Sequence, residues 1–117
     1  MKHRSGSLYL QDILQAMNRV EEYVRGFSYD DFIDDTKTVD AVIRNLLVIG
    51  EAAGKVPKAV RTRHPDIPWK NMTGLRNILV HDYFGIDLTI VWRIVTRNLP
   101  ATKPLIASLL DTENGGS

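Results

Sequence analysis

Two long stretches of the sequence carry apolar residues at three- and four-residue steps. Residues 8–25 contain Leu10, Ile13, Leu14, Met17, Val20 and Val24, and residues 37–55 contain Val39, Val42, Ile43, Leu46, Leu47, Ile49, Gly50 and Ala53. Because an α-helix takes 3.6 residues per turn, this spacing would place each set on one face of a helix. No segment alternates apolar and polar residues between turn signals, as a half-buried strand would. The pattern therefore predicts an all-α fold.

Capping residues set the expected helix ends in the N-terminal half. Ser7 is the expected cap of the first helix, and Gly26 ends its apolar pattern. Ser28 is followed three residues later by Asp31, which is the spacing of a capping box. We therefore expect a short acidic helix between the two long ones.

Prolines and a glycine divide the C-terminal half. Pro57 and the segment HPDIP at 64–68 interrupt the chain, and a third long helix is expected from about Pro68 to Gly85. Asp87 can cap a fourth helix. Two further prolines, Pro100 and Pro104, are expected to bend the chain before a last apolar segment at 105–110.

The length of 117 residues suits one domain, and 44% hydrophobic with 25% charged residues is ordinary for a globular protein. The expected architecture is an up-and-down bundle of four to five helices at 1–110, followed by a disordered tail at 111–117. The formal charge of +1 does not itself indicate a nucleic-acid or membrane partner, and the absence of cysteine excludes disulfides and thiolate metal sites. With no signal-peptide core or membrane-length apolar run, the expected location is the cytoplasm.

One arginine of the third helix falls beside its apolar residues. On a helical projection Arg76 shares a broad side with Met72, Leu75 and Tyr83. A guanidinium in that place needs an anion or a path to water. Glu51, at the margin of the second long apolar stripe, is the candidate counter-charge; a structural ion pair and a functional role both remain open.

The opposite side of the third helix is polar. It carries Lys70, Thr73, Asn77 and His81, with Gly74 beside them. Asn77 and His81 are four residues apart, so the amide could orient the imidazole, although a solvated face would equally explain both. A glycine inside a helix costs roughly 1 kcal/mol relative to alanine, so Gly74 indicates a close approach by a backbone, another helix or a ligand.

The ordered set Arg76, His81 and Tyr83 reads R-x-x-x-x-H-x-Y, and it lies within GLRNILVHDYFGID at 74–87. Together with IGEAAGKVP at 49–57, HPDIPW at 64–69 and VWRIVTRNLP at 91–100, it resembles the HepT family of the HEPN superfamily of ribonuclease toxins. The resemblance covers most of the chain, and every position of the signature is present.

This resemblance implies an all-helical homodimer that cuts RNA without a metal or other cofactor. Arg76 and His81 would be catalytic, with Asn77, Glu51 and Asp82 supporting them. The resemblance also implies a partner, a minimal nucleotidyltransferase (MNT-type) antitoxin that transfers AMP to Tyr83. The alternative is a catalytically silent helical module that binds a nucleotidyltransferase or a nucleotide through the same cleft.

The chemistry expected of these residues favours a dimer. His81 can transfer protons near neutral pH, and Arg76 can stabilise the charge on phosphorus. On an ideal helix the two side chains point about 140° apart and lie about 7.5 Å apart along the axis. We therefore expect a cleft built by two chains. Tyr83 could serve as the AMP acceptor, as a stacking platform for a base or as a core aromatic.

A basic segment precedes the third helix. Lys55, Lys58, Arg61 and Arg63 could contact the RNA backbone, since local clusters of cations attract phosphate. A solvated loop is the alternative. The histidines His3 and His64 have no metal-ligand spacing with the motif histidine, so no metal site is expected.

Overall fold

The computed structural model describes residues 6–81 and 85–115, and it describes side chains at 6–77 and 85–113. Every regular element in these residues is helical, which confirms the all-α prediction. The elements in chain order are α1 (Gly6–Val24), α2 (Tyr29–Asp34), α3 (Thr36–Lys55), α4 (Lys58–Arg63), α5 (Trp69–His81), α6 (Leu88–Arg93), the π-helix η2 (Ile94–Asn98) and α7 (Leu99–Gly115).

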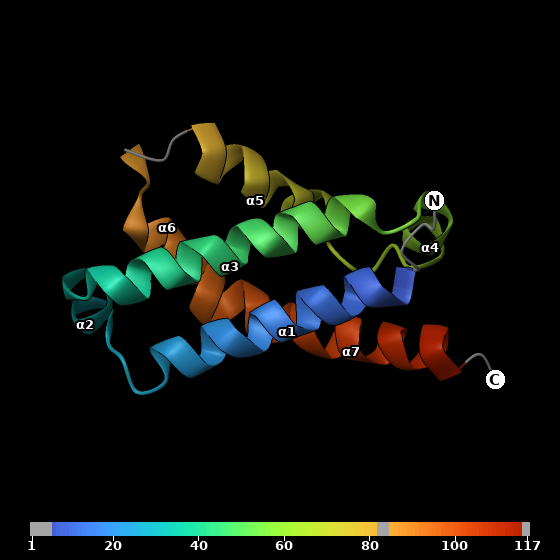
Figure 1. Cartoon of the computed structure of the whole chain (residues 1–117), viewed down its shortest axis with the longest axis horizontal. Coiled ribbons are helices and arrows are strands. Elements are labelled where there is room, and N and C mark those ends of the chain that lie inside the picture. Colours follow the sequence, from blue (N-terminus) through green and yellow to red (C-terminus); the bar gives the residue numbers. More distant parts are fainter. Residues whose placement is uncertain (1–5, 82–84, 116–117) are drawn as a thin grey trace.

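The four longer helices α1, α3, α5 and α7 form the frame of the molecule. Helix α1 packs against α3 and α7, and α3 packs against α5 on its other side. Successive long helices run in opposite directions, so the up-and-down arrangement is confirmed (Figure 1). The short helices α2, α4 and α6 lie at the ends of this frame, which makes the bundle richer in short elements than predicted.

The core is built from the apolar stripes that the sequence indicated. Side chains with no exposed surface come from four helices: Leu10, Ile13 and Met17 of α1, Phe32 of α2, Val42, Leu46 and Ile49 of α3, and Ile106 of α7. The stripe residues Leu14, Val24 and Leu47 are half-buried and pack against this core. Burial of these faces is the main force that holds the helices together.

The predicted capping box of α2 is present. Asp31 N donates to Ser28 Oγ at 3.1 Å, and Ser28 N donates to Asp31 Oδ2 at 3.0 Å. Gly26, with φ of 79°, lies in the left-handed region and follows the end of α1. The prediction for Ser7 is wrong, because α1 already includes Gly6 and Ser7 lies inside its first turn.

Asp87 caps α6, as predicted. Its Oδ1 accepts hydrogen bonds from Thr89 N at 2.9 Å and from the Thr89 hydroxyl. The side-chain bond from Thr89 is the main cause that holds the pKa of Asp87 below its usual value of 3.8.

This lowered pKa predicts a pH-dependent loss of stability. The contribution of Asp87 is present above its unfolded pKa, and it is lost as the pH falls through the lower folded value. Asp87→Ala should therefore be less stable than wild type at about pH 7, and the difference should shrink well below pH 3.8. Urea unfolding of both proteins across this range measures it. A difference that stays constant would contradict the assignment.

The two prolines of the C-terminal region do not interrupt the helix, since both Pro100 and Pro104 lie within α7. The bend expected from them lies slightly earlier, between α6 and α7 (Figure 1), where the π-helix lies and Leu99 N donates to Ile94 O. Pro100 follows this π-helix in a continuous helical run and lacks the N–H that would donate the next hydrogen bond, so the wider turn lies directly before the missing donor.

Helix α7 also continues past the predicted boundary at 110, as far as Gly115. The ion pair between Glu113 and Arg63 at 3.5 Å ties this last part of α7 to α4. The half-buried Leu110 packs against the core nearby. These contacts stabilise the helical conformation of residues 111–115, for which the sequence predicted a disordered tail.

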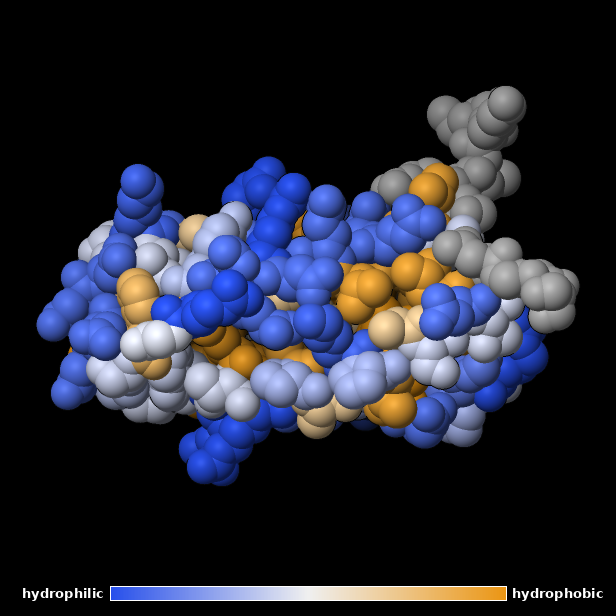
Figure 2. All heavy atoms as spheres, turned by 90° about the horizontal axis from the view of Figure 1, so that it is seen from below, coloured by the Kyte–Doolittle hydropathy of each residue, from blue (hydrophilic) through white to orange (hydrophobic). Residues whose placement is uncertain are grey.

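The surface seen in Figure 2 is mainly hydrophilic, with apolar atoms visible between the polar side chains. Large apolar side chains with substantial exposure are Leu8, Tyr23, Ile33 and Ile90. Within the described part of the chain, no helix combines the length and the apolarity that crossing a bilayer would require.

Candidate active site

Helices α3 and α5 approach each other most closely at Gly50. A Cβ atom at this position would lie 3.0 Å from Arg76 N and 3.1 Å from Met72 O. Only glycine allows the two backbones to come this near, so the height of Arg76 above α3 is fixed by helix packing. The sequence predicted a close approach at Gly74 by a backbone, another helix or a ligand. No backbone or helix of the described chain makes it, because a Cβ at Gly74 would meet nothing within 4 Å, and the ligand stays a prediction.

The two glycines provide a matched pair of substitutions. Gly74→Ala should stabilise the protein by about 0.5–1 kcal/mol, since alanine is the better helix former and the space is open. Gly50→Ala brings the same propensity gain but forces two packed backbones apart, so it should be less stable than Gly74→Ala by about 1–3 kcal/mol. Urea unfolding of both variants measures the difference. Equal shifts would show that α5 can move freely away from α3.

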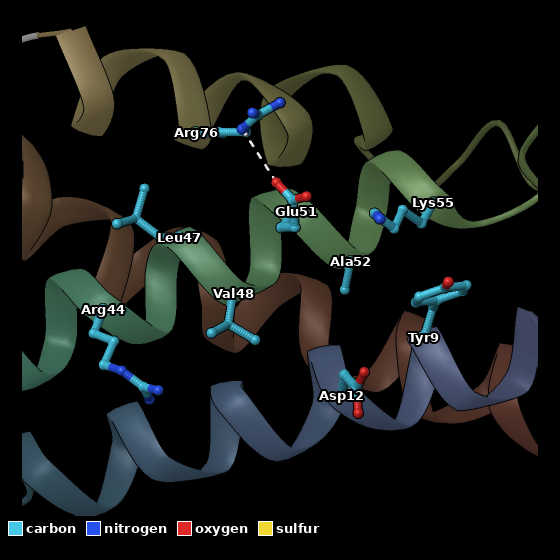
Figure 3. A pocket seen from close by; sticks show the side chains of 9 residues that line it. All are labelled: Tyr9, Asp12, Arg44, Leu47, Val48, Glu51, Ala52, Lys55 and Arg76. Carbon is cyan, nitrogen blue, oxygen red and sulfur yellow. Dashed lines mark ion pairs between the residues drawn. The ribbon is translucent and has the colours of Figure 1, made fainter. Parts of the chain in front are cut away.

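Arg76 forms an ion pair with Glu51, the partner that the sequence indicated. Arg76 Nε lies 3.1 Å from Glu51 Oε2 (Figure 3). The two side chains are 61% and 51% exposed, so the guanidinium reaches water and is not buried. At such exposure an ion pair contributes about 0–1 kcal/mol, and the pair is better understood as positioning than as stabilisation. The outer end of the guanidinium points away from Glu51 (Figure 3), and Glu51 is its one ion-pair partner among the described residues.

A hollow of about 550 Å³ opens beside this ion pair. Arg44, Glu51 and Lys55 of α3 line it together with Arg76 and with Tyr9 and Asp12 of α1 (Figure 3). Sequence reasoning did not single out Tyr9, Asp12 or Arg44. A signal existed for Arg44, because charged residues recur on α3 at 44, 51 and 55, which is helical spacing for one face.

A second hollow, of about 510 Å³, lies between α3 and α5, and we call it the α3–α5 groove. It is lined by Gly50, Glu51, Gly54, Lys55, Lys70, Thr73, Gly74, Arg76 and Asn77. The groove thus brings together four residues that the sequence proposed for the site: Arg76, Asn77, Glu51 and Lys55.

The remaining motif residues follow at the end of α5. His81 is the last residue of α5, one turn beyond Asn77, and its side chain lies outside the described residues. Asp82 and Tyr83 also lie outside the described residues. The orientation of His81 by Asn77, and the roles of Asp82 and Tyr83, therefore stay predictions.

The basic segment before α5 folds into the helix α4, so its alternative reading as a loop is wrong. Lys58 and Arg61 line a third hollow of about 400 Å³, which we call the α4–α5 hollow, together with Thr62, Trp69, Lys70 and Thr73. Arg63 does not line this hollow and instead forms an ion pair with Glu113 on α7. Three of the four predicted backbone contacts, Lys55, Lys58 and Arg61, thus line hollows that adjoin Arg76 or α5.

The described residues contain no group of three or more His, Asp or Glu side chains that could hold a metal ion. Cations and amides, together with the ion-paired carboxylate of Glu51, are the polar groups around Arg76 in the α3–α5 groove. Such a set suits an anionic ligand that carries its own hydrogen-bond acceptors.

Comparison with known proteins also indicates a ribonuclease family. The family described as "Ribonuclease HepT-like" matches residues 13–109. The "Probable ribonuclease HepT" of Thermococcus cleftensis is 42% identical over 100 residues, which cover 86% of this chain and 91% of the relative. The "Putative RNase" of Methanocaldococcus jannaschii is 43% identical over 103 residues, which cover 88% and 94%.

A third relative, a "Putative RNase" of Caldanaerobacter subterraneus, is 36% identical over 105 residues, which cover 90% of this chain and 94% of the relative. No solved structure matches the chain. The family match over most of the chain and the relatives of similar length confirm the family resemblance seen in the sequence. The chain belongs to the HepT-like ribonuclease family.

Proposed function

We propose that the chain is a metal-independent endoribonuclease toxin in which Arg76 and His81 are catalytic. The observation that carries this proposal is the α3–α5 groove. Arg76 and Asn77 of α5 line it together with Glu51 and Lys55 of α3, and α5 ends at His81. The names of the relatives, which describe them as ribonucleases, support the same activity.

The proposed reaction needs no metal. The ribose 2′-oxygen attacks the adjacent phosphorus, the P–O5′ bond breaks, and the products are a 2′,3′-cyclic phosphate and a 5′-hydroxyl. A base takes the proton of the 2′-hydroxyl and an acid gives one to the leaving oxygen. His81 suits both proton transfers, and Arg76 stabilises the phosphorane through its charge and its planar fork of donors. Glu51 holds the guanidinium in place.

We propose a homodimer as the active form. One histidine per chain would have to act as base and acid in the same step, whereas two chains supply two imidazoles. A second copy would also overcome the divergence of Arg76 and His81 along a single helix, about 140° and 7.5 Å. A monomer with full activity would contradict this assembly.

We also propose that a nucleotidyltransferase antitoxin of the MNT type inhibits the enzyme. The chain would then be the toxin of a type II/VII-like pair in the cytoplasm. AMP on Tyr83 would add bulk and negative charge seven residues from Arg76, where RNA must approach. Intact mass after co-expression with a candidate antitoxin tests this step. The mass should rise by one or more AMP units, and an increase that persists in Tyr83→Phe would refute the assigned acceptor.

The activity itself is tested with purified protein and RNA in the presence of a chelator. Wild type should cut RNA and leave 2′,3′-cyclic phosphate ends, and the double variant Arg76→Ala/His81→Ala should leave the RNA intact. A need for added divalent metal, or products with 3′-hydroxyl ends, would contradict the mechanism. Intact RNA with every protein would favour the silent module that binds a nucleotidyltransferase or a nucleotide.

A further inference from the structure

Two hollows adjoin one another along α5. The α3–α5 groove contains Arg76, and the α4–α5 hollow lies nearer to the start of α5. Lys70 and Thr73 line both of them. A ligand that extends from the groove at Arg76 towards the α4–α5 hollow therefore passes along these two side chains.

The α4–α5 hollow is positively charged. Lys58, Arg61 and Lys70 line it, and no carboxylate does. None of the three takes part in an ion pair with a described residue, whereas neighbouring Arg63 is paired with Glu113. Arg61 Nε is buried and has no hydrogen-bond partner within the described chain. This nitrogen is covered by protein atoms, so an anion from outside would meet the terminal nitrogens of Arg61 and the two lysines.

The wall of the hollow is held in a fixed position. Trp69 is 8% exposed, and its Nε1 donates to His64 O at 3.0 Å, which fastens the segment before α5 onto the helix. Thr73 Oγ1 donates to Lys70 O at 3.1 Å, so this hydroxyl is satisfied by the helix. The cations are thus the groups available to a ligand, and the start of α5 adds a positive partial charge beside them.

The spacing of the cations fits a strand of RNA. Lys70 and Arg76 are six residues apart, or about 9 Å along the helix axis, so the two cations can contact different phosphates of one strand. Gly54 and Gly74 line the groove without a side chain that would fill it, and the space at Gly74 is open. A sugar–phosphate backbone can therefore lie along this face of α5.

We propose that the α4–α5 hollow is a second phosphate subsite, in which Lys70, with Arg61 and Lys58 beside it, binds the backbone phosphate of a nucleotide outside the cleaved step. The inference rests on the proposed ribonuclease activity and deepens it. It makes single-stranded RNA of several nucleotides the preferred substrate class, because such a strand is long enough to contact Arg76 and Lys70 through different phosphates. It also assigns Lys70 a binding role that is separate from the chemistry.

Binding of labelled single-stranded RNA tests the subsite without cleavage. The His81→Ala protein is used as background, with Lys70→Gln added, and RNA is lengthened stepwise from a dinucleotide. Lys70→Gln should raise the Kd of the longer oligonucleotides about two- to fivefold, the range for one exposed ion pair, and leave the dinucleotide unchanged. The slope of log K against log salt should fall by about 0.7, the value for one lost phosphate contact on a single strand.

Lys37→Gln in the same background is the matched control, since Lys37 is an exposed lysine in the first turn of α3 and lines none of these hollows. If Lys70→Gln and Lys37→Gln bind every length equally, the subsite is overturned. If Lys70→Gln weakens the dinucleotide as much as the longer RNA, Lys70 acts at the cleaved step and the assignment is wrong. Length-dependent binding by a wild type that cuts no RNA would keep the subsite and refute the ribonuclease proposal.

Discussion

Replacing Arg76 or His81 by alanine should lower the rate of RNA cleavage by about 10²–10⁴-fold while the helices persist. Each change removes a group that acts on the transition state, either the cation facing the phosphorane or the proton carrier. Arg76 is 61% exposed, so its loss leaves no cavity in the core. Single-turnover cleavage of a defined RNA measures the rate, and circular dichroism checks the fold.

Two milder variants separate the effect of the positive charge of Arg76 from the effect of the position of its guanidinium. Arg76→Lys keeps the positive charge but loses the planar fork, so it should fall between wild type and Arg76→Ala. Glu51→Gln keeps the size of the partner but weakens its hold on the guanidinium, so it should retain more activity than Arg76→Ala. Near-normal cleavage by Arg76→Ala would remove this residue from the mechanism.

Phe32→Ala should cost about 3–5 kcal/mol in the free energy of unfolding, the largest loss of stability that we predict for one substitution. Phe32 has no exposed surface, and its ring centroid lies 5.1 Å from that of Trp92. The ring thus joins α2 to α6, and α2 also packs on α3. Removing it leaves a cavity that a helix of six residues cannot close by itself.

Ile33 is the matched control for this change. It follows Phe32 in the same helix, and it is 38% exposed. Ile33→Ala should cost about 1 kcal/mol or less, since little buried surface is lost. Chemical denaturation of both variants at one temperature decides the matter. Equal losses would mean that α2 as a whole, and not the buried ring, is being destabilised.

The fold could be predicted well wherever local sequence determines it. The periodic stripes of α1 and α3, the capping box at Ser28 and the cap at Asp87 all depend on residues a few positions apart. The π-helix and the extension of α7 depend on contacts across the molecule. Glu113 pairs with Arg63, which lies near the middle of the sequence, and no local pattern reveals that pairing.

The candidate site could be predicted in part for the same reason. The need of Arg76 for a counter-charge correctly led to Glu51, although the pair lies at the surface. A glycine inside a helix costs the same at position 50 as at position 74, so propensity alone could not tell which one lies under a neighbouring backbone. Arg61 and Arg63 lie two residues apart in α4, so they point to different faces once this segment is helical, and the sequence alone did not establish that helix.

The ion pair of Arg76 sets a limit on how firmly this protein can retain RNA. An incoming phosphate meets the outer nitrogens of a guanidinium whose Nε already has a carboxylate oxygen at 3.1 Å, so the positive charge is partly compensated and the net gain from binding is small. The extra negative charge that develops on phosphorus during the reaction makes this attraction strongest at that moment. For the proposed reaction, the cut strand would then depart readily, and one toxin molecule could process many transcripts in succession.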